Sequence, residues 1–421
     1  MTGIPFGFGP ADREPDDDGG TGSGSSPLSG FPGIPADLAG KVPLFAELQK
    51  LLSWQGGPVN WDLARQLAIS QLSGGHQMTS PGDSSQTADA LRVADIWLDA
   101  VTSLPSGVTA TGAWSRVEWV ERTLPVWSTL CDPVAARVVT AMNSALPAEA
   151  AAQAGPLLGI MSQVGGLMFG AQVGQALGSL AEEVLSSTDV GLPLGPPGLA
   201  ALVPENVAAF GAGLELPTDE VRLFLALREA AHHRLFGHVP WLRQRLLDTV
   251  ESYARGITVD TAAIEQAMAS IDPSDPESLQ SALSGGMFEP EATGDQKVAL
   301  ARLETMLALV EGWVDDVVAD AATDRLPGSD ALRETLRRRR ATGGPAEQTF
   351  ATLVGLELRP RRLRDAATLW RLLREERGSS GRDEVWRHPD LLPDAEDLAD
   401  PAGFVRRTAA DDSDTDPLAG L

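Results

Sequence analysis

The stretch Val221–Trp241 reads VRLFLALREAAHHRLFGHVPW and contains three of the five histidines of the chain. Its apolar residues recur at a helical period, and Thr218–Glu220 before it supplies a hydroxyl and acidic groups of the kind that begin a helix. We therefore predict a helix on which Arg228 and His232 lie near the middle of the apolar face. Both side chains then need polar partners, because an unpaired charge is costly to bury.

The neighbouring Glu229 falls on the shoulder of this helix, beside a predicted polar face that carries Arg222 and His233. The spacing Arg228-Glu229-x-x-His232 matches the metal-binding motif H-E-x-x-H, except that arginine takes the first position. In the intact motif both histidines bind one zinc ion, and the glutamate acts as general base on the metal-bound water. An arginine stays protonated, so it cannot be a zinc ligand.

The residues around the motif make it more specific. Glu229–Arg243 reads EAAHHRLFGHVPWLR and resembles the motif helix of a family of actinobacterial zincin-like metallopeptidases. Gly57–Asp62 (GPVNWD) is similar to the amino-terminal signature of that family, and Val310–Asp315 (VEGWVD) resembles its Glu-Gly-His segment. The resemblance covers most of residues 40–400. It implies a mainly helical (α+β) zincin-like metallopeptidase fold with a small sheet.

The same resemblance implies roles for single residues. Glu229 matches the catalytic base, and His232 and Glu311 match metal ligands. By contrast, Arg228 and Trp313 stand at motif positions where neither side chain can bind zinc. Zinc is therefore the cofactor that the resemblance implies, but these two substitutions favour a degenerate site without it.

A physical account of the substitution follows from charge. We predict that the guanidinium of Arg228 pairs with Glu311, and also with Glu229, which balances the charge of the site without a metal ion. The chain would then be a noncatalytic member of the family. Its cleft would bind a peptide or protein partner, or the chain would serve as a scaffold.

The alternative is an active zinc-dependent metallopeptidase or hydrolase that uses His232, Glu311 and a replacement ligand, with Glu229 as base. His238 could turn back toward the motif, and Glu251 lies about where some zincins hold a third ligand. The other possibility is that His238 is a surface or capping residue near the end of the helix.

Composition divides the chain into segments. Residues 1–36 are rich in Gly, Pro, Ser and Asp and lack the basic and apolar regions of a secretory signal, so we predict a disordered tail. Residues 37–400 carry the periodic apolar pattern of the zincin-like domain, which could form two helical lobes, 37–187 and 188–400. Residues 401–421 are predicted to be a disordered acidic tail.

Three further segments carry structural predictions. A helix is expected over Gln296–Ala322 and a loop over Gly74–Ser85. The resemblance to the zincin-like family also implies a short strand or hairpin around Leu192–Val203, where Gly and Pro alone would predict only a weak strand. The uncharged segment from Ala150 to Ala181 is long enough to span a membrane, but its recurrent glutamines and its glycines at every fourth position favour a buried helix of a soluble fold. We expect this glycine ridge to pack against the helix of the H-E-x-x-H-like motif.

Charge and cysteine content narrow the function further. The net charge of −25 and pI near 4.5 argue against nonspecific binding to nucleic acid or to an anionic membrane. Because the glutamines and glycines of residues 150–181 favour a soluble helix, we also expect no stable membrane insertion. The one strongly basic run, Arg337–Arg340, is predicted to end a helix. The single cysteine, Cys131, excludes an internal disulfide and favours the reducing cytoplasm.

Overall fold

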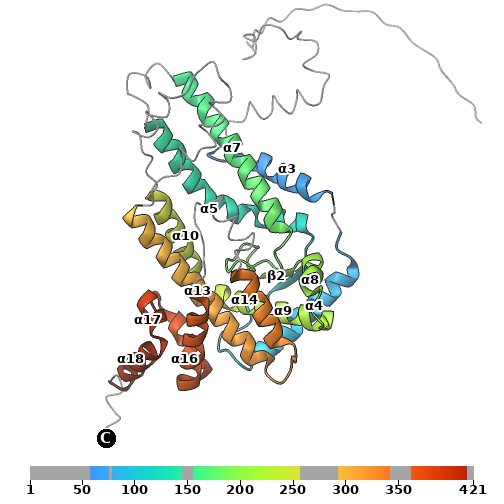
Figure 1. The fold of residues 1–421 in the computed structure, drawn as a ribbon, viewed down its shortest axis with the longest axis vertical. Coiled ribbons are helices and arrows are strands. Elements are labelled where there is room, and N and C mark those ends of the chain that lie inside the picture. The colour runs from blue at the N-terminus through green and yellow to red at the C-terminus, as the bar shows by residue number, and fades with distance from the viewer. Residues whose placement is uncertain (1–56, 75–77, 145–154, 257–292, 342–361, 415–421) are drawn as a thin grey trace, which may run out of the picture. The chain divides into compact units, whose positions relative to one another are not determined.

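Helices form most of the chain that the structure describes (Figure 1). The computed structural model describes residues 57–74, 78–144, 155–256, 293–341 and 362–414. The α-helices are α3 (Trp61–Leu72), α4 (Pro81–Leu98), α5 (Arg116–Ser144), α7 (Gly155–Ala181), α8 (Pro204–Gly211), α9 (Thr218–His238), α10 (Pro240–Arg255), α13 (Gly294–Ala322), α14 (Ser329–Ala341), α16 (Leu363–Glu384), α17 (Ala395–Ala399) and α18 (Pro401–Asp414). Two 3-10 helices, η1 (Val385–Arg387) and η2 (Pro389–Leu391), follow α16.

A small parallel sheet joins two distant segments. Its strands are β1 (Ala110–Ala113) and β2 (Leu199–Leu202), with Ala110 opposite Leu199 and Ala113 opposite Leu202. β2 lies inside the segment in which the family resemblance implies a strand, whereas β1 was not predicted. The predicted mainly helical class with a small sheet is confirmed.

The motif helix α9 lies at the centre of the described elements and packs against α4, α13, β2, α8, α10 and α14. Every residue from Phe224 to Leu235 is buried, so the polar face predicted around His233 is wrong, and only 8% of His233 is exposed. Neighbours on several sides of α9 supply partners for its charged groups. Arg234, for example, is 1% exposed and donates to Asp95 at 2.8 Å and to Asp99 at 2.6 Å.

The glycine ridge of α7 packs against α3 and not, as was predicted, against α9. A Cβ added at Gly170 would lie 2.5 Å from the carbonyl oxygen of Asn60, and one added at Gly174 would lie 2.6 Å from that of Ala64. The ridge therefore lets α3 approach closely, and the expected contact with α9 is wrong. In the described residues, no helix combines the length and the apolar character that crossing a bilayer would need.

The helix α4 begins inside the predicted Gly74–Ser85 loop. Ser80 and Asp83 form a capping box, in which each side chain bonds the backbone N–H of the other, and Pro81 takes the first helical turn. These residues are turn formers in isolation, but at a helix start the same groups satisfy free N–H donors.

The carboxyl-terminal segment also differs from its prediction. Residues 401–414 of the expected acidic tail form α18, which packs against α16 and buries Phe404 and Val405. Trp54–Leu421 forms one compact unit, with no division near residue 187. The predicted tail 1–36 lies outside the described residues.

Candidate functional site

The predicted ion pair between Arg228 and Glu311 is present at the centre of the buried helices. Arg228 Nη2 of α9 donates to Glu311 Oε2 of α13 at 2.5 Å, and the two side chains are 8% and 6% exposed. One turn along α9, His232 Nε2 lies 3.1 Å from Glu311 Oε1. Its Nδ1 lies 2.8 Å from the carbonyl oxygen of Arg228. The carboxylate of Glu311 and the carbonyl of Arg228 only accept, so both contacts are hydrogen bonds only when each ring nitrogen of His232 carries a proton.

A second guanidinium reaches the same carboxylate from α14. Arg340 Nη1 donates to Glu311 Oε2, and Arg340 Nη2 donates to the carbonyl oxygen of Asp189 at 2.7 Å. We call Arg228, His232, Glu311 and Arg340 the guanidinium site. Two cations from separate helices thus converge on one buried glutamate.

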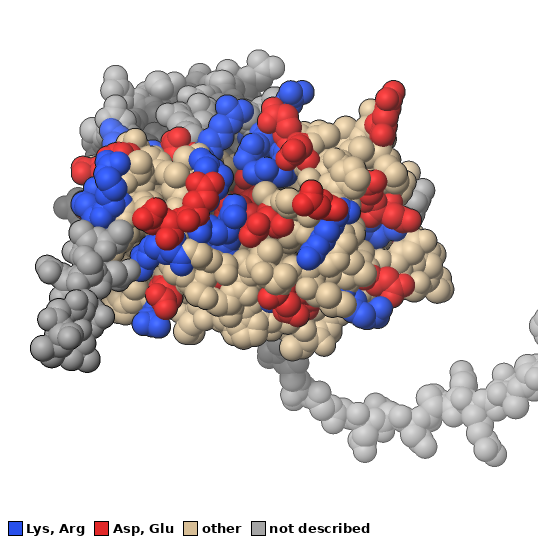
Figure 2. Space-filling model, turned by 90° about the horizontal axis from the view of Figure 1, so that it is seen from below, with Lys and Arg blue, Asp and Glu red and all other residues tan. Residues whose placement is uncertain are grey.

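Sequence reasoning placed Arg340 only in the basic run Arg337–Arg340 at the end of a helix. The run does lie on a helix, in the last described turns of α14, and the residues after Ala341 are outside those that the structure describes. A basic run in an acidic chain was the one sign that Arg340 could have a role in the site. The residues around Arg340 do not predict that α14 packs beside α13. On the face drawn in Figure 2, basic and acidic side chains are intermixed, as expected where most arginines have carboxylate neighbours.

The electrostatics of the guanidinium site favour ionised groups. Burial by itself would raise the pKa of Glu311, but Arg340, His232 and Arg228 hold that pKa well below its usual range. Burial lowers the pKa of Arg228, and the carboxylate of Glu311 opposes this shift. An arginine begins so far above neutrality that it remains charged. Two guanidinium groups against one carboxylate leave the guanidinium site with an excess of positive charge, and the carboxylate of Asp189, 3.8 Å from Arg340 Nη2, lies where it offsets that excess.

The motif glutamate, Glu229, belongs to a different set of contacts. Thr188 Oγ1 donates to Glu229 Oε2 at 2.6 Å, and the backbone N–H of Ala201 in β2 donates to Oε1 at 3.0 Å. Ser187 Oγ also donates to Oε1, and His233 Nε2 lies 3.2 Å from the same atom. We call these five residues the Glu229 network. It ties α9 to β2 and to the segment before β2.

The position of Glu229 on α9 explains this separation. Arg228 and His232 are four residues apart and share one face of the helix, whereas Glu229 and His233 share a face about 100° away. Glu229 is therefore not the second partner of Arg228, contrary to the prediction. Burial alone would raise the pKa of Glu229, but hydrogen bonding and charge from His233, with hydroxyl donors, lower it to about 2. The carboxylate is fully buried.

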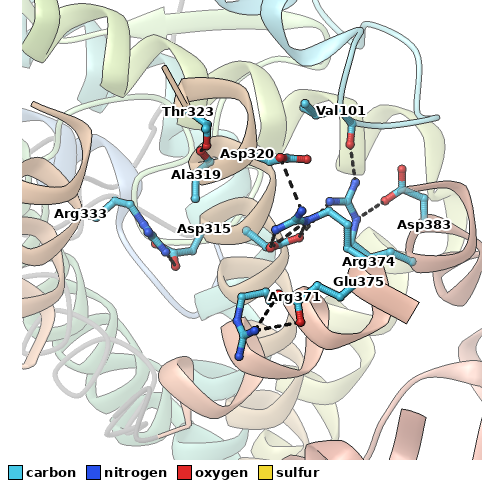
Figure 3. Close-up of polar contacts among 12 residues, drawn as sticks. Val101, Asp315, Ala319, Asp320, Thr323, Arg333, Arg371, Arg374, Glu375 and Asp383 are labelled. Carbon is cyan, nitrogen blue, oxygen red and sulfur yellow. Dashed lines mark hydrogen bonds and ion pairs between the residues drawn. The ribbon is translucent and has the colours of Figure 1, made fainter. Parts of the chain in front are cut away.

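Trp313 lies in a third cluster, between α13 and α16. Its Nε1 donates to Asp383 Oδ1 at 2.9 Å. Arg382 donates to Asp383 at 2.8 Å and to Asp316 at 2.9 Å, and Arg374 donates to Asp316 at 3.1 Å. Figure 3 shows the positions of Arg374 and Asp383 in this cluster. At the position where the family's Glu-Gly-His segment has a histidine, this chain therefore has a buried packing residue that is bonded away from Glu311.

The proposed replacement ligands lie elsewhere. His238 is exposed, and its Nε2 lies 3.2 Å from the carbonyl oxygen of Ser106. Glu251 of α10 is 54% exposed and approaches Arg255 at 3.9 Å. Among the residues that the structure describes, no three His, Cys, Asp or Glu side chains are grouped so that they could hold a metal ion.

Comparisons with known proteins agree with the architecture. The chain belongs to the family of zincin-like metallopeptidases, which matches residues 59–405. A crystal structure from Chloroflexus aurantiacus, described as that of a "putative hydrolase with a novel fold", is similar with a TM-score of 0.60 and 20% identity, and the match covers 83% of this chain and 99% of that one. At this identity the likeness shows the fold alone. No curated protein matches the chain.

The family implies zinc, and the guanidinium site can be tested for its fit. A catalytic zinc ion takes three protein ligands with free lone pairs. Here Glu311 Oε2 accepts from two guanidinium groups, and His232 Nε2 meets the other oxygen of the same carboxylate. The orientation of His232, with Nδ1 on a backbone carbonyl, is the one that metal-bound histidines use. The remaining donor set does not fit, because two fixed cations would repel the metal ion.

Proposed function

We propose that this chain is a zincin-like protein whose motif site contains arginine in place of zinc, and that it binds a peptide or protein partner without hydrolysing it. One observation carries the proposal: Arg228 and Arg340 both donate to Glu311 inside the buried core. A site that already holds these cations has no electrostatic reason to bind Zn²⁺.

The buried state of Glu229 supports the same proposal. A general base must be able to reach the proton that it removes. The two oxygens of Glu229 accept hydrogen bonds from Ser187, Thr188 and Ala201, and the side chain has no exposed surface. Its carboxylate is therefore engaged in holding β2 against α9.

A cavity beside α9 offers room for a few atoms of a bound peptide. This cavity, of about 60 Å³, is lined by His233, Arg243 and the Gly-Pro segment at residues 195–198. It lies next to the motif helix without involving the guanidinium site. The single cysteine favours action in the cytoplasm, as the sequence predicts.

Metal analysis tests the proposal directly. The chain is purified without a histidine tag, and its zinc content is measured together with its hydrolysis of a mixed fluorogenic peptide library. We expect zinc far below one ion per chain and no hydrolysis above that of a His232→Ala variant. Near-stoichiometric zinc that disappears in His232→Ala would overturn the proposal and favour the active peptidase.

A further inference from the structure

Two adjoining cavities meet at Arg243, on the first turns of α10. The larger, of about 60 Å³, is lined by His233 and by the segment from Pro193 to Gly198. The smaller, of about 20 Å³, is lined by aliphatic side chains of α5, α10 and α13, Leu246 and Leu303 among them. Arg243 and Pro193 line both cavities. We call the pair the Arg243 pocket.

Arg243 differs from the other arginines near the core. It is partly buried, yet within the described residues it makes no hydrogen bond and no ion pair. By contrast, the partly buried Arg333 and Arg374 each bond a carboxylate of α13. A partly desolvated guanidinium favours an anionic partner, and a carboxylate matches its planar array of donors. The chain has a net charge of −25 but provides no such partner here among its described groups.

His233 brings a second polar group to the same pocket. Its Nε2 is engaged by Glu229 at 3.2 Å, and the side chain is more than nine-tenths buried. Its Nδ1 makes no hydrogen bond with any described residue, and the ring lines the larger cavity. Because the ring lines the cavity and Nδ1 has no partner among the described residues, this nitrogen is free to bond a polar atom of a ligand.

The size and lining of the pocket limit the ligand. A water molecule needs roughly 10–15 Å³ of such volume, so 60 Å³ accommodates a carboxylate with only a few carbon atoms. The aliphatic lining and small volume of the adjoining cavity, with Leu246 and Leu303, favour a small apolar side chain over a polar one. The rest of a longer ligand would have to leave through the opening.

We propose that the Arg243 pocket binds the free carboxyl-terminal residue of a peptide that ends in a small aliphatic amino acid. The carboxylate pairs with Arg243, His233 Nδ1 bonds a polar atom of the same residue, and the side chain enters the aliphatic cavity. The choice of a peptide over a free acid rests on the peptide-binding function proposed above; recognition of the carboxylate rests on Arg243 alone.

Binding of a defined probe tests this proposal. Fluorescein-labelled Gly-Ala-Ala-Val with a free carboxylate is titrated with the whole chain, and its carboxyl-terminal amide serves as the matched probe. We expect the amide to bind at least about tenfold more weakly, because a charge-assisted hydrogen bond is lost. Arg243→Gln should weaken binding of the acid by a similar factor. Arg245→Gln, an exposed arginine on the same helix that lines neither cavity, should change it less than twofold.

Several results would overturn the proposal. These are equal binding of acid and amide, an Arg243→Gln variant that folds and binds normally, or absence of binding by the free acid. Isobutyrate that competes at the concentration of the peptide itself would overturn the peptide assignment. Thermal unfolding checks that Arg243→Gln retains its fold. Zinc content is measured on the same sample, so failure of this pocket is distinguished from failure of the zinc-free function.

Discussion

Each of two faces of α9 contacts or carries a buried carboxylate, and the two carboxylates are stabilised by different kinds of partner. On one face, Glu311 is surrounded by the guanidinium groups of Arg228 and Arg340. On the other face, Glu229 is bonded by hydroxyl groups, one backbone N–H and His233. Both carboxylates have a lowered pKa in spite of burial, but one owes this mainly to fixed cations and the other to hydrogen-bond donors and a histidine.

This difference separates residues that work together in a zinc enzyme. The base of an H-E-x-x-H motif acts on water bound to the metal that the histidines hold. Here the residues at those positions, Glu229 and His232, belong to two networks that stabilise different helix contacts. The spacing of the H-E-x-x-H motif is kept in this chain. Ion pairs take the place of the metal ion on which the motif residues would act together.

The largest effect is expected for Glu311→Gln. Removing the negative charge leaves Arg228 and Arg340 without their shared partner in the core, and breaking a buried pair in this way costs about 3–5 kcal/mol. Urea unfolding measures the loss in the free energy of unfolding. The control is Glu251→Gln, the same change at a site 54% exposed, which should stay within about 0.5 kcal/mol. Equal stability of the two variants would contradict the ion cluster.

A smaller loss is expected for the same substitution at Glu229. Glutamine keeps one acceptor oxygen but turns an N–H₂ group toward donors such as Thr188, so the variant should lose about 2–3 kcal/mol in the free energy of unfolding. The matched pair of Glu→Gln variants compares the two faces directly. A greater loss at Glu229 than at Glu311 would reverse the comparison.

The contribution of Glu229 to the free energy of unfolding should depend on pH. Its pKa is about 2 in the folded chain against 4.5 for the ordinary group, so the unfolded state binds more protons between these values. The stabilisation from Glu229 is fully present above pH 4.5 and is lost as pH falls toward 2. Unfolding of the wild type and of Glu229→Gln, measured from pH 6 to pH 3, should show a stability difference that shrinks in acid. A constant difference would contradict the lowered pKa.

Arg228→Leu should cost the least of the buried changes. Glu311 keeps Arg340 and His232 as partners, and leucine fills part of the space, so we expect a loss of about 1–2 kcal/mol in the free energy of unfolding. Arg222→Leu on the same helix breaks a pair with the 91% exposed Asp219 and should cost less than about 1 kcal/mol. If both variants unfold at the same denaturant concentration, the contribution of the Arg228 pair is no greater than that of a surface pair.

Local sequence patterns were enough for part of this structure. The apolar period predicts α9 and α13, and the cost of burying Arg228 on an apolar face predicts a carboxylate partner, which is Glu311. The family resemblance identified the segment around Glu311 as the place to look for it. These inferences succeed because helical period and charge pairing depend on a few residues at fixed spacing.

The remainder depends on contacts between distant segments. Arg340 reaches Glu311 only because α14 packs beside α13, and the burial of His233 depends on β2 and the preceding segment. The apolar period of α9 predicts one buried face and could not show that other elements also bury the face of His233. The glycine ridge of α7 showed that a close helix contact exists but not that α3 makes it.

Zinc calorimetry tests whether the guanidinium groups of Arg228 and Arg340 hold the place of a metal ion. The variant Arg228→His/Arg340→Gln restores two histidines and Glu311 around the site and removes the second cation. We expect zinc to bind this variant at one site per chain, binding to be abolished by the further change His232→Ala, and the wild type to bind no zinc there. Wild-type binding of zinc that is as tight as that of the variant, and is lost with His232→Ala, would contradict this expectation.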